Sequence, residues 1–353
     1  MISTLAKSLG RMVSMRNKLL TLAALALLAG CSANPIYSTT GVVLSSYAEG
    51  EAVPYVLQMS DPEMTCALGE SLDPLVYSFS RVIEAPDTTG SLMMLLAGNC
   101  SEARAWEAEL EYLREDYAGN VPAAKDARER TKRLNAETAK RRYIAFQRAM
   151  AAYDFDPGAE ELECPFLFED QDELTFMVGL LTGLQAIVND ANSGAMAGVP
   201  RNIAPQAERA ATCLDNEKWA GLPNAVRSLV WLLLPDTRPA LSPDPWQVLE
   251  NSSKLSIEAG FRVSMALEAV AAETFGKPDV LEDVVARFAE ADNTIEVNDD
   301  YRLLDEVARD VIEFSSDKKW TASYGHRTPR RHFGKMSPES EEEVETMNLD
   351  DLL

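Results

Sequence analysis

Apolar residues recur at helical spacing along almost the whole chain after Ser60, and this periodicity limits the fold class more than any other feature. Around Trp106 they fall at positions i, i+4, i+7 and i+11, and around Leu281 at i, i+3, i+4 and i+7, so each set lies on one face of a helix. No segment shows the convincing two-residue alternation of a half-buried strand. We therefore predict an all-α fold of antiparallel helix hairpins, stacked as a tetratricopeptide-like α-solenoid or as a compact helical array.

Composition divides the chain into four parts. These are a signal peptide at 1–30, a lipidated cysteine with a flexible tether at 31–58, a helical domain at 59–322, and a disordered charged tail at 323–353. The tether is predicted because its Ser, Thr, Gly, Ala and Pro residues lack helical apolar spacing. Within the helical domain, a break between Asp154 and Asp170 gives possible halves at 59–155 and 171–322.

The N-terminal region has the three parts of a secretory signal. A basic lead precedes an apolar run that begins at Leu19, and the run ends in the small residues of Leu28-Ala29-Gly30-Cys31. This run is too short to span a bilayer. Leu28, Ala29, Gly30 and Cys31 resemble the bacterial lipobox, which implies cleavage before Cys31 and acylation of that residue. The alternative is an ordinary cleaved signal with an incidental cysteine.

The residue that follows the lipobox-like motif indicates which of the two bacterial membranes would hold the protein. Ser32 stands there in place of the Asp that retains lipoproteins in the inner membrane of the enterobacterial type. We therefore expect a protein anchored by lipid to the outer membrane and facing the periplasm. Met15 gives a more compact signal than Met1, and the sequence leaves the choice of start between them open.

Four cysteines remain once Cys31 is acylated. They are Cys66, Cys100, Cys164 and Cys213. An even number in an oxidising compartment indicates disulfides, and four cysteines allow three pairings. We favour pairing between neighbours, Cys66 with Cys100 and Cys164 with Cys213, which links adjacent helices. Four buried free thiols are the alternative.

The chain is strongly acidic, with a formal net charge of −23 at pH 7. Such a surface repels nucleic acid, so we expect no nucleic-acid partner. One predicted helix, from about Pro122 to Tyr153, is basic over its first two thirds. A helix of this kind forms salt bridges with its own acidic neighbours or binds a partner, and for partner binding the candidate residues are Arg133, Arg141 and Arg142.

The sequence lacks the constellations that support catalysis. The two histidines, His326 and His332, lie in the predicted tail, away from the helical domain. Residues 292–300 resemble a calcium loop in composition but lack its glycine and terminal glutamate, so we interpret them as a helix-capping loop. We therefore predict that the protein is not an enzyme and name no catalytic, cofactor-binding or metal-binding residue.

Several short motifs resemble the T component of TRAP (tripartite ATP-independent periplasmic) transporters, a family of periplasmic tetratricopeptide-like lipoproteins. They are Asp61-Pro62-Glu63, Leu92-Met93-Met94-Leu95-Leu96-Ala97-Gly98, Lys140-Arg141-Arg142-Tyr143, Cys213-Leu214-Asp215, Trp219-Ala220-Gly221-Leu222-Pro223, Leu232-Leu233-Leu234-Pro235 and Lys277-Pro278-Asp279. The resemblance implies a membrane-tethered scaffold that docks a periplasmic solute-binding protein and admits an apolar ligand between its helices. Two alternatives are a tetratricopeptide-like lipoprotein of envelope assembly and, less favoured, a periplasmic enzyme with a carboxylate site.

Overall fold

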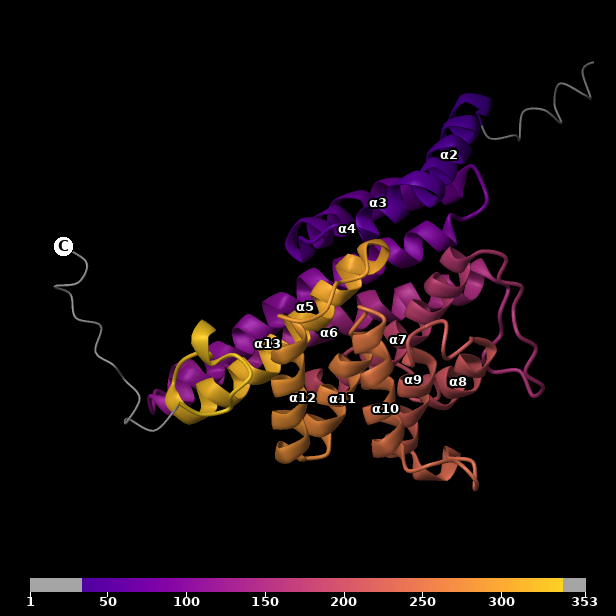
Figure 1. The fold of residues 1–353 in the computed structure, drawn as a ribbon. Helices are drawn as coiled ribbons and strands as arrows, with labels where there is room; N and C mark the ends of the chain where they lie inside the picture. The colour runs from indigo at the N-terminus through magenta and orange to yellow at the C-terminus, as the bar shows by residue number, and fades with distance from the viewer. Residues whose placement is uncertain (1–33, 339–353) are drawn as a thin grey trace, which may run out of the picture.

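The structure is a computed structural model that describes residues 34–338 (Figure 1). Within this range the regular elements are all helices, which confirms the predicted all-α fold. The predicted signal peptide, the lipobox-like residues from Leu28 to Cys31 and both alternative starts lie outside the described residues, as do residues 339–353.

Four long helices form the first layer. They are α4 (Pro62–Tyr77), α5 (Asp87–Tyr117), α6 (Val121–Ala152) and α7 (Asp170–Ser193). A tight turn at Gly119 joins α5 to α6, and its φ of +73° is one that glycine adopts without steric cost. The prolines at the starts of α4 and α6 suit the first helical turn, where no backbone N–H is needed.

Shorter helices pack beneath this layer. They are α8 (Ile203–Ala210), α9 (Leu222–Leu233), α10 (Pro245–Glu258), α11 (Val263–Thr274) and α12 (Pro278–Ala291). The last long helix, α13 (Arg302–Tyr324), runs back along α5 (Figure 1), where the rings of Phe314 and Trp106 stack with centroids 4.7 Å apart. This return closes the array, so the fold is the compact alternative and not an open solenoid.

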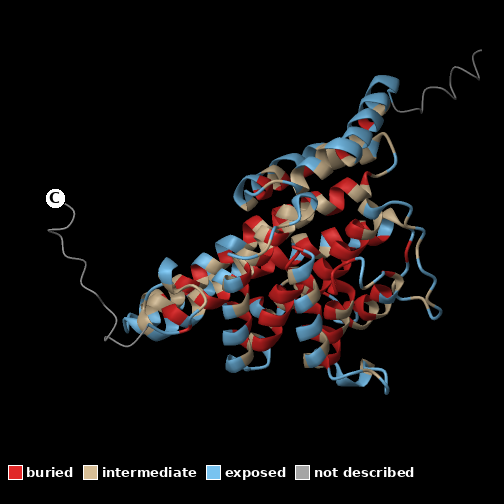
Figure 2. Ribbon diagram, in the orientation of Figure 1, coloured by how far each residue is buried: buried red, intermediate tan, exposed pale blue. Residues whose placement is uncertain are grey.

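One hydrophobic core extends across the predicted break between halves. The main cluster contains Phe146 and Ala149 of α6 together with Phe176 of α7, and it continues to Leu249 of α10 (Figure 2). Close approach of α6 and α7 depends on Gly179, because a Cβ there would lie 2.3 Å from the Cβ of Ala149. The two expected halves therefore share a core and are not separate domains.

The disulfides follow the predicted neighbour pairing. Cys66 of α4 is bonded to Cys100 of α5, with 5.1 Å between their Cα atoms. Cys164 in the segment after α6 is bonded to Cys213 in the short 3-10 helix after α8, with 5.5 Å between Cα atoms.

Helix α7 is the longest apolar stretch of the described chain. It has the length and composition of a membrane span, and 78% of its apolar window is buried inside the protein. An apolar core helix meets the same criterion, so composition alone does not distinguish the two.

The predicted flexible tether is wrong for residues 35–57. They form α2 (Pro35–Tyr47), a π-helical turn (Ala48–Ala52) and α3 (Val53–Leu57). Asn34 caps α2 by accepting a hydrogen bond from the backbone N–H of Ile36 at 3.0 Å, and Gly41 packs against Phe79. The apolar residues of α2 do recur at helical spacing, but they lie on its exposed side, and only Gly41 and Ala48 are buried in these first two elements. The prediction of a tether gave more weight to the Ser, Thr, Gly and Ala residues between them.

The predicted disordered tail is also wrong for residues 323–338. The indole N–H of Trp320 donates to the backbone oxygen of Lys335 at 2.9 Å, and Met336 is buried in a small second core with Phe288. Both histidines lie against the ring of Trp320, His326 at 5.8 Å and His332 at 5.6 Å between centroids. This segment folds because it covers the end of α13.

Candidate functional site: a cavity between the helices

A cavity of about 540 Å³ lies between α5, α6, α7, α9, α11 and α13. Its volume falls in the range of small-molecule sites, which is about 300–1,000 Å³. The apolar part of the wall comes mainly from α7, α11 and α13, and includes Leu181, Val188, Leu267, Val270, Val307 and Val311.

The helix stripes that form this wall have apolar residues at helical spacing in the sequence. The stripe of α11 contains Val263, Leu267 and Val270, and that of α13 contains Leu304, Val307 and Val311. Most of these side chains are only partly buried because they face the cavity as well as their neighbours. Sequence periodicity showed that the faces are apolar but gave no signal that a space lies between them.

A buried polar network lies on the cavity wall formed by α5, α6 and α7. Arg142 of α6 is 2% exposed and forms a two-pronged ion pair with Glu102 of α5, with both nitrogen-to-oxygen distances 2.5 Å. Its guanidinium also donates to Asn189 at 2.7 Å, and Asn189 in turn donates to Asn135 at 3.0 Å. Such a network holds its members in fixed positions, since a buried polar group without a partner is costly.

The side chain of Arg142 packs against Gly98, the last residue of the Leu92–Gly98 motif that resembles the TRAP T component. A Cβ at Gly98 of α5 would lie 3.2 Å from the Cγ of Arg142, so a larger residue there would require the arginine side chain to shift by a few tenths of an ångström. Among the described residues the Nε of Arg142 has no hydrogen-bond partner. The motif ending in Gly98 and the motif containing Arg142 are thus brought into direct contact.

Further charged groups lie on the cavity wall. Burial raises the pKa of Glu109, an effect that nearby Glu273 increases and Lys318 opposes. Lys318 itself forms an ion pair with Glu273 at 2.6 Å. The cavity therefore combines an apolar body with a polar portion, which suits a small amphipathic molecule. Among the described residues, no group of three or more His, Cys, Asp or Glu side chains is placed to hold a metal ion.

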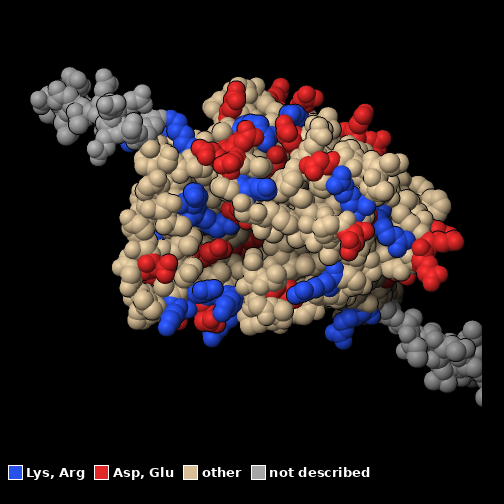
Figure 3. All heavy atoms as spheres, turned by 90° about the horizontal axis from the view of Figure 1, so that it is seen from below, with Lys and Arg blue, Asp and Glu red and all other residues tan. Residues whose placement is uncertain are grey.

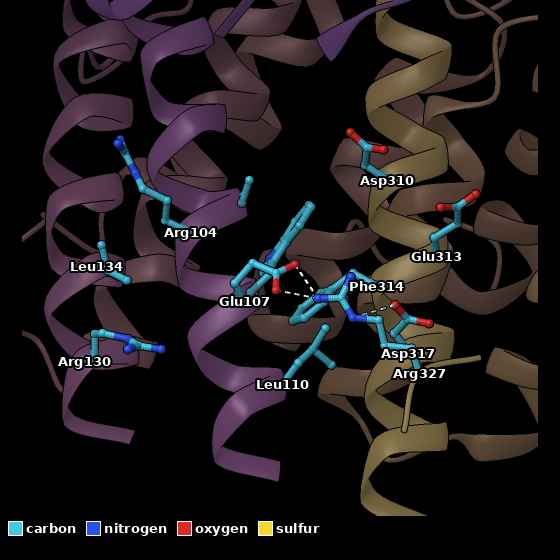
Figure 4. Close-up of a pocket in the computed structure, with 12 residues that line it drawn as sticks. Arg104, Glu107, Leu110, Arg130, Leu134, Asp310, Glu313, Phe314, Asp317 and Arg327 are labelled. Carbon is cyan, nitrogen blue, oxygen red and sulfur yellow. Dashed lines mark hydrogen bonds and ion pairs between the residues drawn. The ribbon is translucent and has the colours of Figure 1, made fainter. Parts of the chain in front are cut away.

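A second hollow, open to solvent, lies between α5 and α13. It has a volume of about 670 Å³, and the stacked rings of Trp106 and Phe314 separate it from the cavity, since both residues line both spaces. Figure 4 shows Arg327 reaching into this groove, where its guanidinium pairs with Glu107 and lies 3.9 Å from Asp317.

Two carboxylates of α13, Asp310 and Glu313, line the same groove (Figure 4). Neither makes a hydrogen bond or an ion pair with another of residues 34–338. Burial raises the pKa of Asp310 to about 6, and the charges of Glu313 and Glu306 act in the same direction. Burial likewise raises the pKa of Glu313.

The structure separates the three predicted partner-binding arginines. Arg133 is exposed and makes no ion pair with a described residue, whereas Arg141 is paired with Glu70 at 2.5 Å and with Glu137 at 2.6 Å. Arg142 is buried in the cavity wall. The assignment of Arg142 to a partner surface is therefore wrong, because its side chain is buried and paired with Glu102. Arg141 is partly exposed and already paired within the fold, and its role in partner binding stays a prediction.

Other cations of α6 remain on its outer surface. Lys125, Arg133 and Lys140 are exposed, and none of them forms an ion pair within the described part of the chain. At 100° per residue they fall within an arc of about 80° on one face of the helix, which also contains the exposed Glu129, paired with Lys132. In the view from below, acidic and basic side chains are interspersed, and the surface is hollowed near its centre (Figure 3).

Comparison with known proteins gives no match. No protein-family model, no curated protein and no solved structure matches this chain.

Proposed function

We propose that this chain is a membrane-tethered helical scaffold of the periplasm that holds a small, mostly apolar ligand in its cavity and docks a partner protein. The observation that carries the proposal is the cavity of about 540 Å³, whose wall is apolar on α7, α11 and α13 and polar near Arg142. Pockets that bury most of a small ligand have this composition, with a few fixed polar groups that orient the molecule.

The partner that we propose is a periplasmic solute-binding protein, with the chain acting as the T component of a TRAP-type transport system. The resemblance implies a helical fold with a space between its helices, and the all-helical array with its cavity supports that reading. Membrane attachment through an acylated Cys31 belongs to the same proposal. Replacing Cys31 with Ala should release the protein from membranes and abolish labelling with palmitate; persistence of both would refute the anchor.

Filling the cavity tests ligand binding. We expect a fluorescent fatty-acid analogue to bind the purified protein, and Val270→Trp or Val311→Trp to weaken its affinity at least tenfold because the indole occupies the apolar part of the cavity. Val121→Trp is the matched control, since Val121 is exposed and outside the cavity. Equal affinities of the cavity variants and the control, with melting temperatures retained, would contradict the proposal.

The exposed face of α6 is the proposed docking surface for an acidic partner. A basic face on a chain of net charge −23 offers local attraction where the rest of the surface repels. We expect cross-linking in cells to capture the partner, and Lys125→Glu, Arg133→Glu and Lys140→Glu together to slow its association. Association of the unaltered protein should also slow as salt rises, because charges more than about 10 Å apart are screened at about 0.1 M.

The control for this experiment reverses three exposed cations elsewhere, Arg201, Lys277 and Lys319. Both triple variants change the net charge equally, so only a local effect distinguishes them. Capture of a solute-binding protein supports the transporter function, and capture of outer-membrane assembly proteins instead would favour the envelope-assembly alternative. Equal association rates for the two triple variants would exclude α6 as the docking surface.

A further inference from the structure

Helix α2 is unusual on so acidic a chain. Its thirteen residues, Pro35–Tyr47, contain no charged side chain, and the helix projects from the body of the molecule (Figure 1). Nearly all of it is exposed (Figure 2). Large apolar side chains are among the exposed residues, with Ile36 70% exposed, Val43 59% and Tyr47 60%.

Five of the six exposed large apolar side chains of α2 lie on one side of the helix, whereas Val42, which is 54% exposed, lies outside that side. At 100° per residue, Ile36, Tyr37, Val43, Leu44 and Tyr47 fall within an arc of about 120°. We call these five residues the α2 stripe. The side that meets the body lies outside this arc, because Gly41 is the buried residue of the helix and a Cβ there would lie 2.9 Å from Phe79. Gly41 lies about 100° from the centre of the α2 stripe, so most of the stripe is turned away from the described core.

The position of the helix in the chain indicates what covers the stripe. Pro35 follows Cys31 by four residues, which span at most about 14 Å even when fully extended. If Cys31 is acylated, the first turn of α2 is held at the bilayer surface. Charged residues resume only at Glu49 and Glu51, just after the helix ends. The uncharged segment thus coincides with the stretch that the anchor brings nearest to lipid.

We propose that α2 lies in the interface of the outer membrane, with the α2 stripe buried among the lipid headgroups as a second anchor. The inference rests on the membrane tether of the proposed function. Tyrosine suits this depth because its ring is apolar and its hydroxyl reaches water, as in Tyr37 and Tyr47. A helix without charge also avoids the repulsion that the rest of this acidic surface meets at anionic lipids.

Vesicle flotation of a chain beginning at Ser32 tests this inference without the acyl group. That chain retains every described helix, both cores and both disulfides, all of which lie within residues 34–338. We expect it to float with phosphatidylcholine vesicles, with little effect of salt. Ile36→Ser, Val43→Ser and Leu44→Ser together should lower the partition coefficient at least tenfold.

The matched control removes the same three residue types from other surfaces, as Ile144→Ser, Val121→Ser and Leu241→Ser, and should bind like the unaltered chain. Failure of the unaltered chain to float, or equal binding by both triple variants, would overturn the inference. A third result would also overturn the inference. The unaltered chain would form a dimer in analytical ultracentrifugation, and the triple serine variant of the α2 stripe would dissociate that dimer without changing vesicle binding. The stripe would then contact a second copy of the chain and not the membrane. Acylation of Cys31 and probe binding in the cavity are measured separately, so they can succeed or fail independently of this result.

Discussion

Replacing Asp310 with asparagine should stabilise the protein at about pH 8 and leave its stability unchanged below about pH 4. Burial raises the pKa of this carboxyl from 3.8 to about 6, with Glu313 and Glu306 adding to the rise. The folded state therefore binds the proton more tightly than the unfolded state does. Stability that is present below about pH 4 is lost as the pH rises through about 6, where the folded state must hold an ionised carboxylate.

The size of the effect follows from the change in pKa. A rise from 3.8 to about 6 sets an upper limit of about 3 kcal/mol, at about 1.36 kcal/mol per unit. Water in the open groove screens part of this penalty, so we expect a gain of about 1–2 kcal/mol and a rise in melting temperature on the order of 2–5 °C. Asparagine has nearly the shape of aspartate, so packing changes little.

Thermal unfolding followed by circular dichroism at several pH values is the assay. Glu290→Gln is the control, because Glu290 is an exposed carboxylate on α12 and its replacement should change stability by less than about 0.5 kcal/mol. Equal stabilisation by Asp310→Asn at about pH 4 and pH 8 would show that charge is not the cause. No gain at pH 8 would show that the groove does not disfavour the ionised carboxylate.

The remaining predictions concern packing, a buried ion pair and a disulfide. Gly179→Val should destabilise the protein by about 1–3 kcal/mol or more through collision with α6, whereas Gly50→Ala, with open space around it, should be nearly neutral in the same denaturant titration. Asp305→Ala should lower the free energy of unfolding by about 3–5 kcal/mol, because it leaves the fully buried Arg262 without its main partner. A loss below about 1 kcal/mol in urea unfolding would contradict this prediction. Replacing Cys66 and Cys100 together by Ser should cost about 2–4 kcal/mol, and unchanged unfolding by urea would refute a stabilising role for that disulfide.

Local patterns in the sequence were sufficient for much of the fold. The helical spacing around Trp106 and Leu281 predicted α5 and α12, and the cysteine count with chain proximity favoured the two observed disulfides. These features depend on residues near one another in the chain, where helix periodicity and loop length act directly. The lipobox at Cys31 is a local pattern of the same kind, and its acylation stays a prediction.

Only the tertiary structure decided what each helix face meets. The apolar stripes of α11 and α13 look the same in sequence whether they face a packed core or a cavity, because periodicity reports that a face is apolar and not what lies opposite. Helix α2 shows the same limit, because its apolar residues at helical spacing are exposed, whereas Gly41 on its body-facing side packs against Phe79.

The ion pairs that the charged residues form were the feature least predictable from the sequence. Arg133, Arg141 and Arg142 look equivalent in a basic run, yet Arg142 is buried against Glu102, forty positions away, and the partly exposed Arg141 is paired with Glu70. Arg262 likewise forms an ion pair with Asp305 only because α13 is packed against α11. The sequence by itself determined that this chain forms helices and carries excess negative charge. Which charges are neutralised within the described fold and which remain without an ion pair there was decided by helix packing, because ion pairs form between groups that only the folded chain brings within a few ångströms.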